Sequence, residues 1–250
     1  MSSVTSPSFR SSVYFQGISV EDLKGIPGSM LESLKLIPED IQATLLIRHA
    51  HRNEIPEGKV DNILLTDEGK KASFAFGTLL KKFQPGMLMS STMGRCIETA
   101  TQIKEGATWE DQKLKKDPFF APSAPFIRDL PKAIEHYKRL GGPGLFNYQI
   151  NNDPPLEGMR PTKEGVCEFL QRFLTIDHSP GKINVIVTHD AVLTVIVGFL
   201  LNIKEFDDTN WPQFLEGAFF WMDSRYLNVV WRGENHRLDK TLFFQGTSFE

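Results

Sequence analysis

The sequence predicts an α/β fold: a three-layer α/β/α sandwich with a mostly parallel central sheet and an inserted cap segment. Three short apolar runs carry this prediction, at 44–47, 87–89 and 184–188. They are too short for buried helices, and unbroken apolar runs of this kind are typical of parallel strands covered on both faces. Segments with helical spacing of apolar residues separate the runs, which is the order of elements that favours a parallel sheet.

Length and composition favour one globular domain with an extension and an insertion. The chain has 250 residues, of which 40% are hydrophobic and 24% charged, ordinary values for a globular protein. We expect an N-terminal extension over residues 1–40, partly disordered because its first residues are rich in Ser, Thr and Pro. Residues 41–250 are predicted to form a single α/β domain with a cap insertion at about 106–161.

Charge and cysteine content limit the partners and the compartment. The net charge of −3 provides no basic field, so we expect neither nucleic acid nor a membrane as a partner. The two cysteines, Cys96 and Cys167, do not form a disulfide framework, which fits a reducing compartment. The first 15 residues lack the apolar core of a signal peptide, and the apolar stretch 191–201 is too short to span a bilayer. We therefore expect a cytoplasmic protein.

Helix and turn signals predict the remaining elements. Residues 20–36 are weakly amphipathic around a Gly-Pro turn at 25–28, which predicts two short helical pieces. Thr66 with Asp67 and Glu68 behind it predicts a capped helix start, and Thr162 repeats this signal. Residues 191–203 predict a buried helix, and the runs 218–222 and 227–231 predict a hairpin or edge strands.

The segment at about 106–161 differs from the βα units around it. It contains eight prolines and several aromatic residues, and a Gly-Gly pair lies at 141–142. Prolines and glycines at this density predict a loop-rich insertion rather than another βα unit. We expect this insertion to form a cap over the site and to determine substrate selectivity, although most of its aromatic residues are expected to form the insertion's own core.

Cationic and titratable side chains follow each of the three predicted strands. Arg48, His49 and Arg52 come after the first strand, Arg95 follows the second, and His189 with Asp190 follows the third. Ligands of open α/β sheets bind at the carboxyl ends of the strands, so these side chains are predicted to meet in an anion site. Arg95 is expected in the first turn of a helix capped by Ser91 or Thr92, where the helix dipole also favours an anion.

At these residues the sequence resembles the histidine phosphatase superfamily, whose members include phosphoglycerate mutases and acid phosphatases. The resemblance implies that His49 is a phosphorylated nucleophile and that Arg48, Arg52 and Arg95, together with His189, bind the phosphoryl oxygens. Three guanidiniums can stabilise the charge of phosphoryl transfer, so we expect neither a metal nor another cofactor. The residues that carry the resemblance are Arg48-His49 with Arg52, Ser90-Ser91 with Arg95 and Glu98-Thr99-Ala100, and Thr188-His189-Asp190.

The leaving alkoxide requires a proton donor, and the resemblance leaves two candidates open. Asp190 resembles the aspartate of the His-Asp pair in the acid phosphatase branch, whereas Asp129 lies in a segment similar to the acid-bearing segment of the mutase branch. We favour Asp190. The sequence departs from both patterns, because Ala50 replaces the glycine usual after the first histidine and Pro56 lies two positions later than in the acid phosphatase signature.

The function expected from these residues is hydrolysis of a phosphomonoester through a phosphohistidine on His49, without a metal. The partner expected is a small phosphorylated substrate, a mutase is less favoured, and the oligomeric state is not predicted. One alternative is a zinc-dependent metallohydrolase with His49, His51, His189 and Asp190 as ligands. A second alternative is a non-catalytic protein that binds a phosphorylated ligand. Loss of activity with a chelator would favour the zinc enzyme, and phosphate binding without turnover would favour the binding protein.

Overall fold

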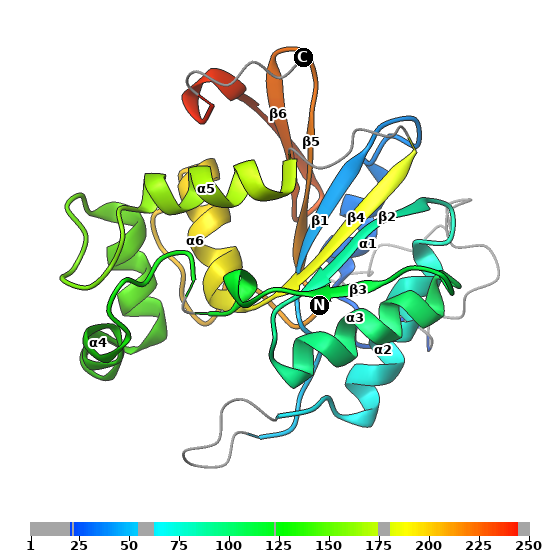
Figure 1. Ribbon diagram of the computed structural model, residues 1–250, viewed down its shortest axis with the longest axis horizontal. Coiled ribbons are helices and arrows are strands. Elements are labelled where there is room, and N and C mark those ends of the chain that lie inside the picture. The colour runs from blue at the N-terminus through cyan, green and yellow to red at the C-terminus, as the bar shows by residue number, and fades with distance from the viewer. Residues whose placement is uncertain (1–20, 22, 55–62, 123, 175–180, 245–250) are drawn as a thin grey trace, which may run out of the picture.

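A seven-stranded sheet forms the centre of the computed structural model, which describes residues 21, 23–54, 63–122, 124–174 and 181–244 (Figure 1). The strand order is β3-β2-β4-β1-β5-β6-β7. The first four strands of this order are parallel, whereas β5, β6 and β7 are joined by antiparallel pairings and β5 pairs antiparallel with β1. The strands are β1 (Ala43–Arg48), β2 (Gln84–Ser90), β3 (Leu114–Lys116), β4 (Lys182–Thr188), β5 (Gly217–Met222), β6 (Tyr226–Trp231) and β7 (Glu234–Asp239).

Helices cover both faces of the sheet, so the predicted three-layer α/β/α arrangement is confirmed (Figure 1). Neighbouring residues of β1 point to opposite faces: Leu45 and Ile47 pack in the core beneath α1, α2 and α3, whereas Leu46 packs in the core beneath α5 and α6. All three side chains are fully buried. The helices are α1 (Gly28–Lys35), α2 (Asp67–Leu79), α3 (Gly94–Gly106), α4 (Leu130–Asn151), α5 (Thr162–Leu174) and α6 (Asp190–Leu201), with short 3₁₀ turns at Pro118–Phe120 and Lys240–Leu242.

The start of α2 is held against the chain that follows β1. The Thr66 hydroxyl accepts a hydrogen bond from the Gly69 amide at 3.1 Å, which confirms the predicted cap. The Thr66 amide in turn donates to the His51 carbonyl. A Cβ atom on Gly69 would lie 2.0 Å from the same His51 oxygen, so only glycine allows this approach. The residues after His49 are thereby fixed by backbone contacts with α2.

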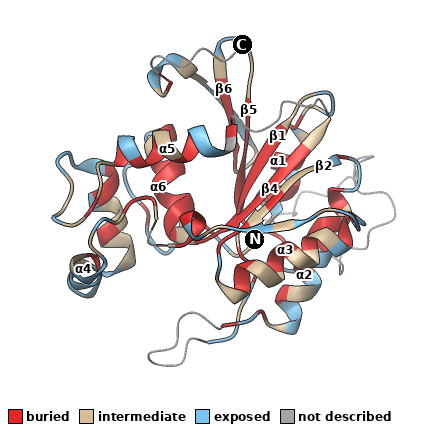
Figure 2. Cartoon of the chain, viewed as in Figure 1, coloured by how far each residue is buried: buried red, intermediate tan, exposed pale blue. Residues whose placement is uncertain are grey.

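Helix α6 is buried along nearly its whole length, as its apolar sequence predicts (Figure 2). It ends at Asn202, whose backbone adopts the left-handed conformation that commonly terminates a helix. Of the helices in the part of the chain that the structure describes, none combines the length and the apolarity needed to cross a membrane.

The cap insertion contains more helix than the sequence predicts. Helix α4 runs for 22 residues through a segment that its prolines and glycines indicated to be loop-rich. Pro131 lies in the first turn of α4, where no amide hydrogen is needed for the helix. Gly141, with φ of 71°, breaks the helix, and Pro143 then lies near the start of its second half. The interpretation of Pro131 and Pro143 as loop signals was therefore wrong, because each lies near the start of a helical piece.

Both ends of the chain contribute elements to the domain. Helix α1 forms within the predicted extension, and its Met30, Leu31 and Leu34 are buried in the main core. The predicted disorder of residues 1–13 concerns positions outside the described residues. The predicted hairpin of β5 and β6 is confirmed, and β7 extends it. Strand β7 was not predicted because its residues are largely polar. None of them is buried, as expected for a strand at the edge of the sheet.

Candidate active site

The carboxyl ends of β1, β2 and β4 lie side by side at one edge of the sheet. Arg48 is paired in register with Thr188 across β1 and β4, and Ser90 is paired with Val187 across β2 and β4. The His49 amide, one residue past β1, donates to the Thr188 carbonyl at 3.0 Å, and the amide of Ser91 donates to the Val187 carbonyl at the same distance. Backbone pairing thus brings together the three polar clusters, which are far apart in the sequence.

Arg95 bridges the two buried histidines of this edge. Its Nε donates to His49 Nε2 at 3.1 Å, and an Nη atom lies 3.2 Å from His189 Nδ1. Arginine has only donors, so both of these imidazole nitrogens accept. The opposite nitrogens then carry the hydrogens: His49 Nδ1 donates to the Ala50 carbonyl at 2.9 Å, and His189 Nε2 donates to the Ser91 hydroxyl at 3.0 Å. The two rings lie 5.5 Å apart between centroids.

Both imidazoles are held in the neutral form. Burial is the main cause that lowers the pKa of His49 to about 3, and the charges of Arg48 and Arg95 lower it further against an opposing hydrogen bond to Ala50. Burial also lowers the pKa of His189 well below its ordinary value, with Arg95 as the next cause. His49 is only 3% exposed and His189 only 1%. His49 therefore carries an unprotonated Nε2 directed at a guanidinium.

Helix α3 delivers Arg95 without the predicted side-chain cap. The helix begins at Gly94 after Met93, which provides no cap, so the expectation of Ser91 or Thr92 in this role is wrong. The Ser91 hydroxyl instead accepts from the Met93 amide and contacts His189. Three residues between the end of β2 and the helix leave Ser91 beside His189 rather than at the helix terminus. Its hydroxyl accepts the hydrogen that the contact with Arg95 leaves on His189 Nε2.

The Arg48 guanidinium contacts Asp190, Pro212 and Phe214. One Nη atom lies 2.8 Å from an Asp190 carboxylate oxygen, and the other donates to the Pro212 carbonyl. The guanidinium lies 4.1 Å above the centre of the Phe214 ring, within range of a cation–π contact. Burial lowers the pKa of Arg48, and the neighbouring carboxylate opposes this shift. The side chain therefore holds its charge next to Asp190.

Asp190 is ionised in this arrangement. Burial alone would raise the pKa of its carboxyl, but the charge of Arg48 and hydrogen bonds from the Trp211 indole and the Ala191 amide lower it. The Trp211 Nε1 to Asp190 distance is 3.2 Å and the Ala191 amide distance is 2.8 Å. Asp190 is thus a charged partner of Arg48.

The other predicted site residues lie at the margin of this cluster or away from it. The Arg52 guanidinium donates to the neighbouring Asn53 carbonyl at 2.9 Å, yet its charge is among those that lower the pKa of His189. His51 is exposed and its Nδ1 contacts the Thr66 hydroxyl. Asp129 caps α4 by accepting from the Lys132 amide at 3.2 Å, so its described bonds belong to the cap segment.

The zinc alternative required four side chains to converge. Among the described residues, no group of three or more His, Cys, Asp and Glu side chains is placed to hold a metal ion. His51 turns toward Thr66, and Asp190 is paired with Arg48 rather than with a histidine. The described geometry of these residues therefore does not fit the proposed ligand set.

Comparison with known protein families finds a match to one segment of the chain. The sequence model of the histidine phosphatase superfamily, branch 1, matches residues 44–120, which include Arg48, His49, Arg52 and Arg95. Over this segment the chain is similar to the histidine phosphatase superfamily. No curated protein sequence matches the chain.

Solved structures share the fold of this chain. Phosphoglycerate mutase from Bacillus anthracis is similar with a TM-score of 0.50 and 15% identity, over 80% of this chain and 93% of that one. A mutant phosphoserine phosphatase from Entamoeba histolytica, in complex with phosphoserine, is similar with a TM-score of 0.50 and 15% identity, over 79% of this chain and 95% of that one. At this identity the likeness concerns the arrangement of the sheet and helices.

Some residues of this site were not predicted from the sequence. The segment 211–216 supplies Trp211 to Asp190, the Pro212 carbonyl to Arg48, and the Phe214 ring to Arg48 and His49. Its backbone also supports the site, because the Glu216 carbonyl accepts from the Arg48 amide at 2.9 Å. The segment carries no cluster of titratable residues, and only the pairing of β5 with β1 brings it to the site.

Proposed function

We propose that this protein is a metal-independent phosphomonoesterase that works through a phosphohistidine on His49. The observation that supports this most strongly is the buried Nε2 of His49, which is unprotonated and lies beside the permanent charge of Arg95. A neutral imidazole is the form that attacks phosphorus, and the adjacent guanidinium stabilises the charge on the transferring phosphoryl group.

The reaction that we propose has two displacements. In the first, His49 Nε2 forms a bond to phosphorus while the ester P–O bond breaks, and the leaving oxygen takes a proton from a carboxylic acid. In the second, water attacks the phosphohistidine, the P–N bond breaks, and inorganic phosphate is released. The hydrogen bond from His49 Nδ1 to the Ala50 carbonyl keeps Nε2 free of hydrogen in the first step. Arg48, Arg52 and Arg95 are the groups that we assign to the phosphoryl oxygens.

Asp190 is the proton donor that we favour over Asp129. Asp190 lies within the cluster of pocket residues, and the charge of Arg48 keeps it ionised. A phosphoryl group that draws Arg48 away would remove this counter-charge, and burial would then raise the pKa of the carboxyl toward the protonated form. The proton donor would thus form when substrate binds.

The substrate that we propose is a small phosphorylated compound, and hydrolysis is favoured over the mutase reaction. The similar structure of Entamoeba phosphoserine phosphatase contains phosphoserine, which makes phosphorylated hydroxyl compounds reasonable first candidates. The two cysteines are free thiols, in keeping with a reducing cytoplasmic location.

The experiment is a screen of phosphorylated metabolites for phosphate release by the full chain. His49→Ala is the inactive control, and His51→Ala is the matched variant of an exposed histidine. Phosphate release that is lost in His49→Ala and kept in His51→Ala supports the proposal, as does trapping of ³²P on the wild-type protein in acid-labile form. Equal turnover by wild type and His49→Ala would refute it. Inhibition by vanadate and retention of activity in EDTA would exclude the zinc alternative.

A further inference from the structure

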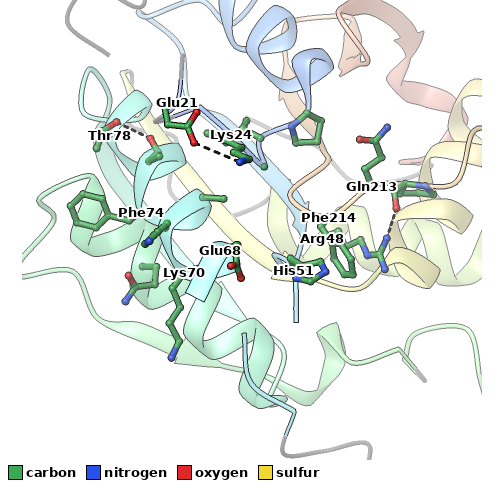
Figure 3. Close-up of a pocket in the computed structure, with 18 of the residues that line it drawn as sticks. Glu21, Lys24, Arg48, His51, Glu68, Lys70, Phe74, Thr78, Gln213 and Phe214 are labelled. Carbon is green, nitrogen blue, oxygen red and sulfur yellow. Dashed lines mark hydrogen bonds and ion pairs between the residues drawn. The ribbon is translucent and has the colours of Figure 1, made fainter. Parts of the chain in front are cut away.

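A large cavity lies next to the catalytic edge, between α2 and the segment 211–214 (Figure 3). Its volume is about 1520 Å³. Arg48, His51 and Phe214 line one end of it, and Phe74 and Thr78 of α2 line another part. Pockets of roughly 300–1,000 Å³ already hold drug-sized ligands, so this cavity has room for far more than a phosphoryl group.

Phe214 connects this cavity to the predicted nucleophile. Its ring lies 5.6 Å from the His49 ring and 5.1 Å from the His51 ring, between centroids, and 4.1 Å from the Arg48 guanidinium carbon. Phe214 and Arg48 therefore belong both to the cavity lining and to the surroundings of His49. A phosphoester held at His49 would have its alcohol portion next to this wall.

Apolar side chains form part of the cavity wall. Trp211, Pro212 and Phe214 contribute to it from the segment 211–214, and Ala72 and Ala75 contribute from α2. The charged side chains around the cavity are of both signs, with Arg48, Lys24, Lys70 and Lys71 on one side of the balance and Glu21 and Glu68 on the other. The charge of Arg48 is already paired with Asp190. Mixed charge offers little preference for a polyanion, whereas apolar walls favour a hydrocarbon group.

We propose that this cavity binds the leaving group, and that the substrate is a phosphomonoester of an extended apolar alcohol. The inference rests on the proposed function, because it takes His49 as the point where the ester is cleaved. The cavity, rather than the cap segment, would then determine substrate selectivity, because no residue of α4 is among those that line it.

A series of alkyl phosphates tests this with the full-length protein. The alcohols released from ethyl and decyl phosphate are similar in acidity. A difference in kcat/KM between the two esters therefore reports how well the protein binds the longer alkyl group. One buried methylene contributes about 0.8 kcal/mol, or roughly fourfold. We expect kcat/KM to be at least about 100-fold higher for decyl phosphate, which corresponds to roughly three to four buried methylenes.

Two variants are designed to fill the cavity, and a third, in the cap segment, is their control. Ala75→Trp and Thr78→Trp place a large ring in the cavity from α2, and Ile134→Trp adds the same ring to an exposed position of α4. We expect the decyl-to-ethyl ratio to fall at least tenfold in the first two variants and to keep its wild-type value in Ile134→Trp. Thermal unfolding curves identify a variant that has not folded, and the other cavity variant then decides.

The outcomes separate this inference from the proposed function. Hydrolysis of both esters with no preference for decyl phosphate, or an unchanged ratio in the folded cavity variants, overturns the inference and leaves the phosphatase proposal intact. If neither ester is hydrolysed, the metabolite screen still decides the phosphatase proposal, and calorimetric titration with decyl phosphate tests the cavity alone. Binding that Ala75→Trp or Thr78→Trp weakens at least tenfold supports the cavity assignment. Absence of binding, as when another part of the chain or a second copy fills the cavity, refutes it.

Discussion

Burial of His49 predicts that acid destabilises the fold. The pKa of this imidazole falls from the ordinary 6.5 to about 3, mainly because the ring is buried. Between these two values the unfolded chain takes up a proton at His49 and the folded chain does not. The free energy of unfolding therefore decreases as the pH falls through this range. From pH 7.5 to pH 5 the loss due to His49 is about 2 kcal/mol, or roughly 30-fold in the unfolding equilibrium constant.

The assay compares urea unfolding at the two pH values in wild type and in His49→Asn. Other groups titrate in both proteins, so the difference between the two pH-dependent losses isolates His49. We expect wild type to lose about 2 kcal/mol more than His49→Asn between pH 7.5 and pH 5. His51→Asn is the control: it gives the change in this pH-dependent loss when an exposed histidine in the same part of the fold is replaced. A difference between wild type and His49→Asn below about 0.5 kcal/mol would show that the folded imidazole is protonated at pH 5, and the argument for a neutral nucleophile would fail.

Three further substitutions test the arrangement of the site. Arg95→Gln removes the charge beside both imidazoles and is expected to lower kcat for phosphoester hydrolysis about 10²–10³-fold, whereas a loss below tenfold in steady-state assays would contradict its role. Asp190→Asn is expected to lower kcat about 10²–10⁴-fold on alkyl phosphates and much less on aryl phosphates, whose leaving groups need no proton; the same pattern in Asp129→Asn instead would make Asp129 the donor. Gly69→Ala brings a Cβ to 2.0 Å from the His51 carbonyl, so we expect a loss of about 1–3 kcal/mol in urea unfolding, and wild-type stability would refute the close packing of α2.

Local signals in the sequence determined the elements that carry the predicted catalytic residues. The apolar runs before His49 and His189 are strands because uninterrupted β-branched and aliphatic residues suit a sheet covered on both faces. The cap at Thr66 was predictable because a hydroxyl before two acids satisfies a free amide at a helix start. Three polar clusters after parallel strands also predicted one shared edge, and the register of β1, β2 and β4 places them there.

Only the tertiary structure decided which side chains touch within that edge. Arg48 follows the strand as the sequence indicates, but its contacts with Asp190, Pro212 and Phe214 depend on the antiparallel return of β5 beside β1. Helix α4 was hidden by its prolines, because their effect depends on whether they fall at a helix start or in its interior. A pairing between distant segments leaves no local pattern in the sequence, so the segment 211–216 and the cavity beside it became visible only in three dimensions.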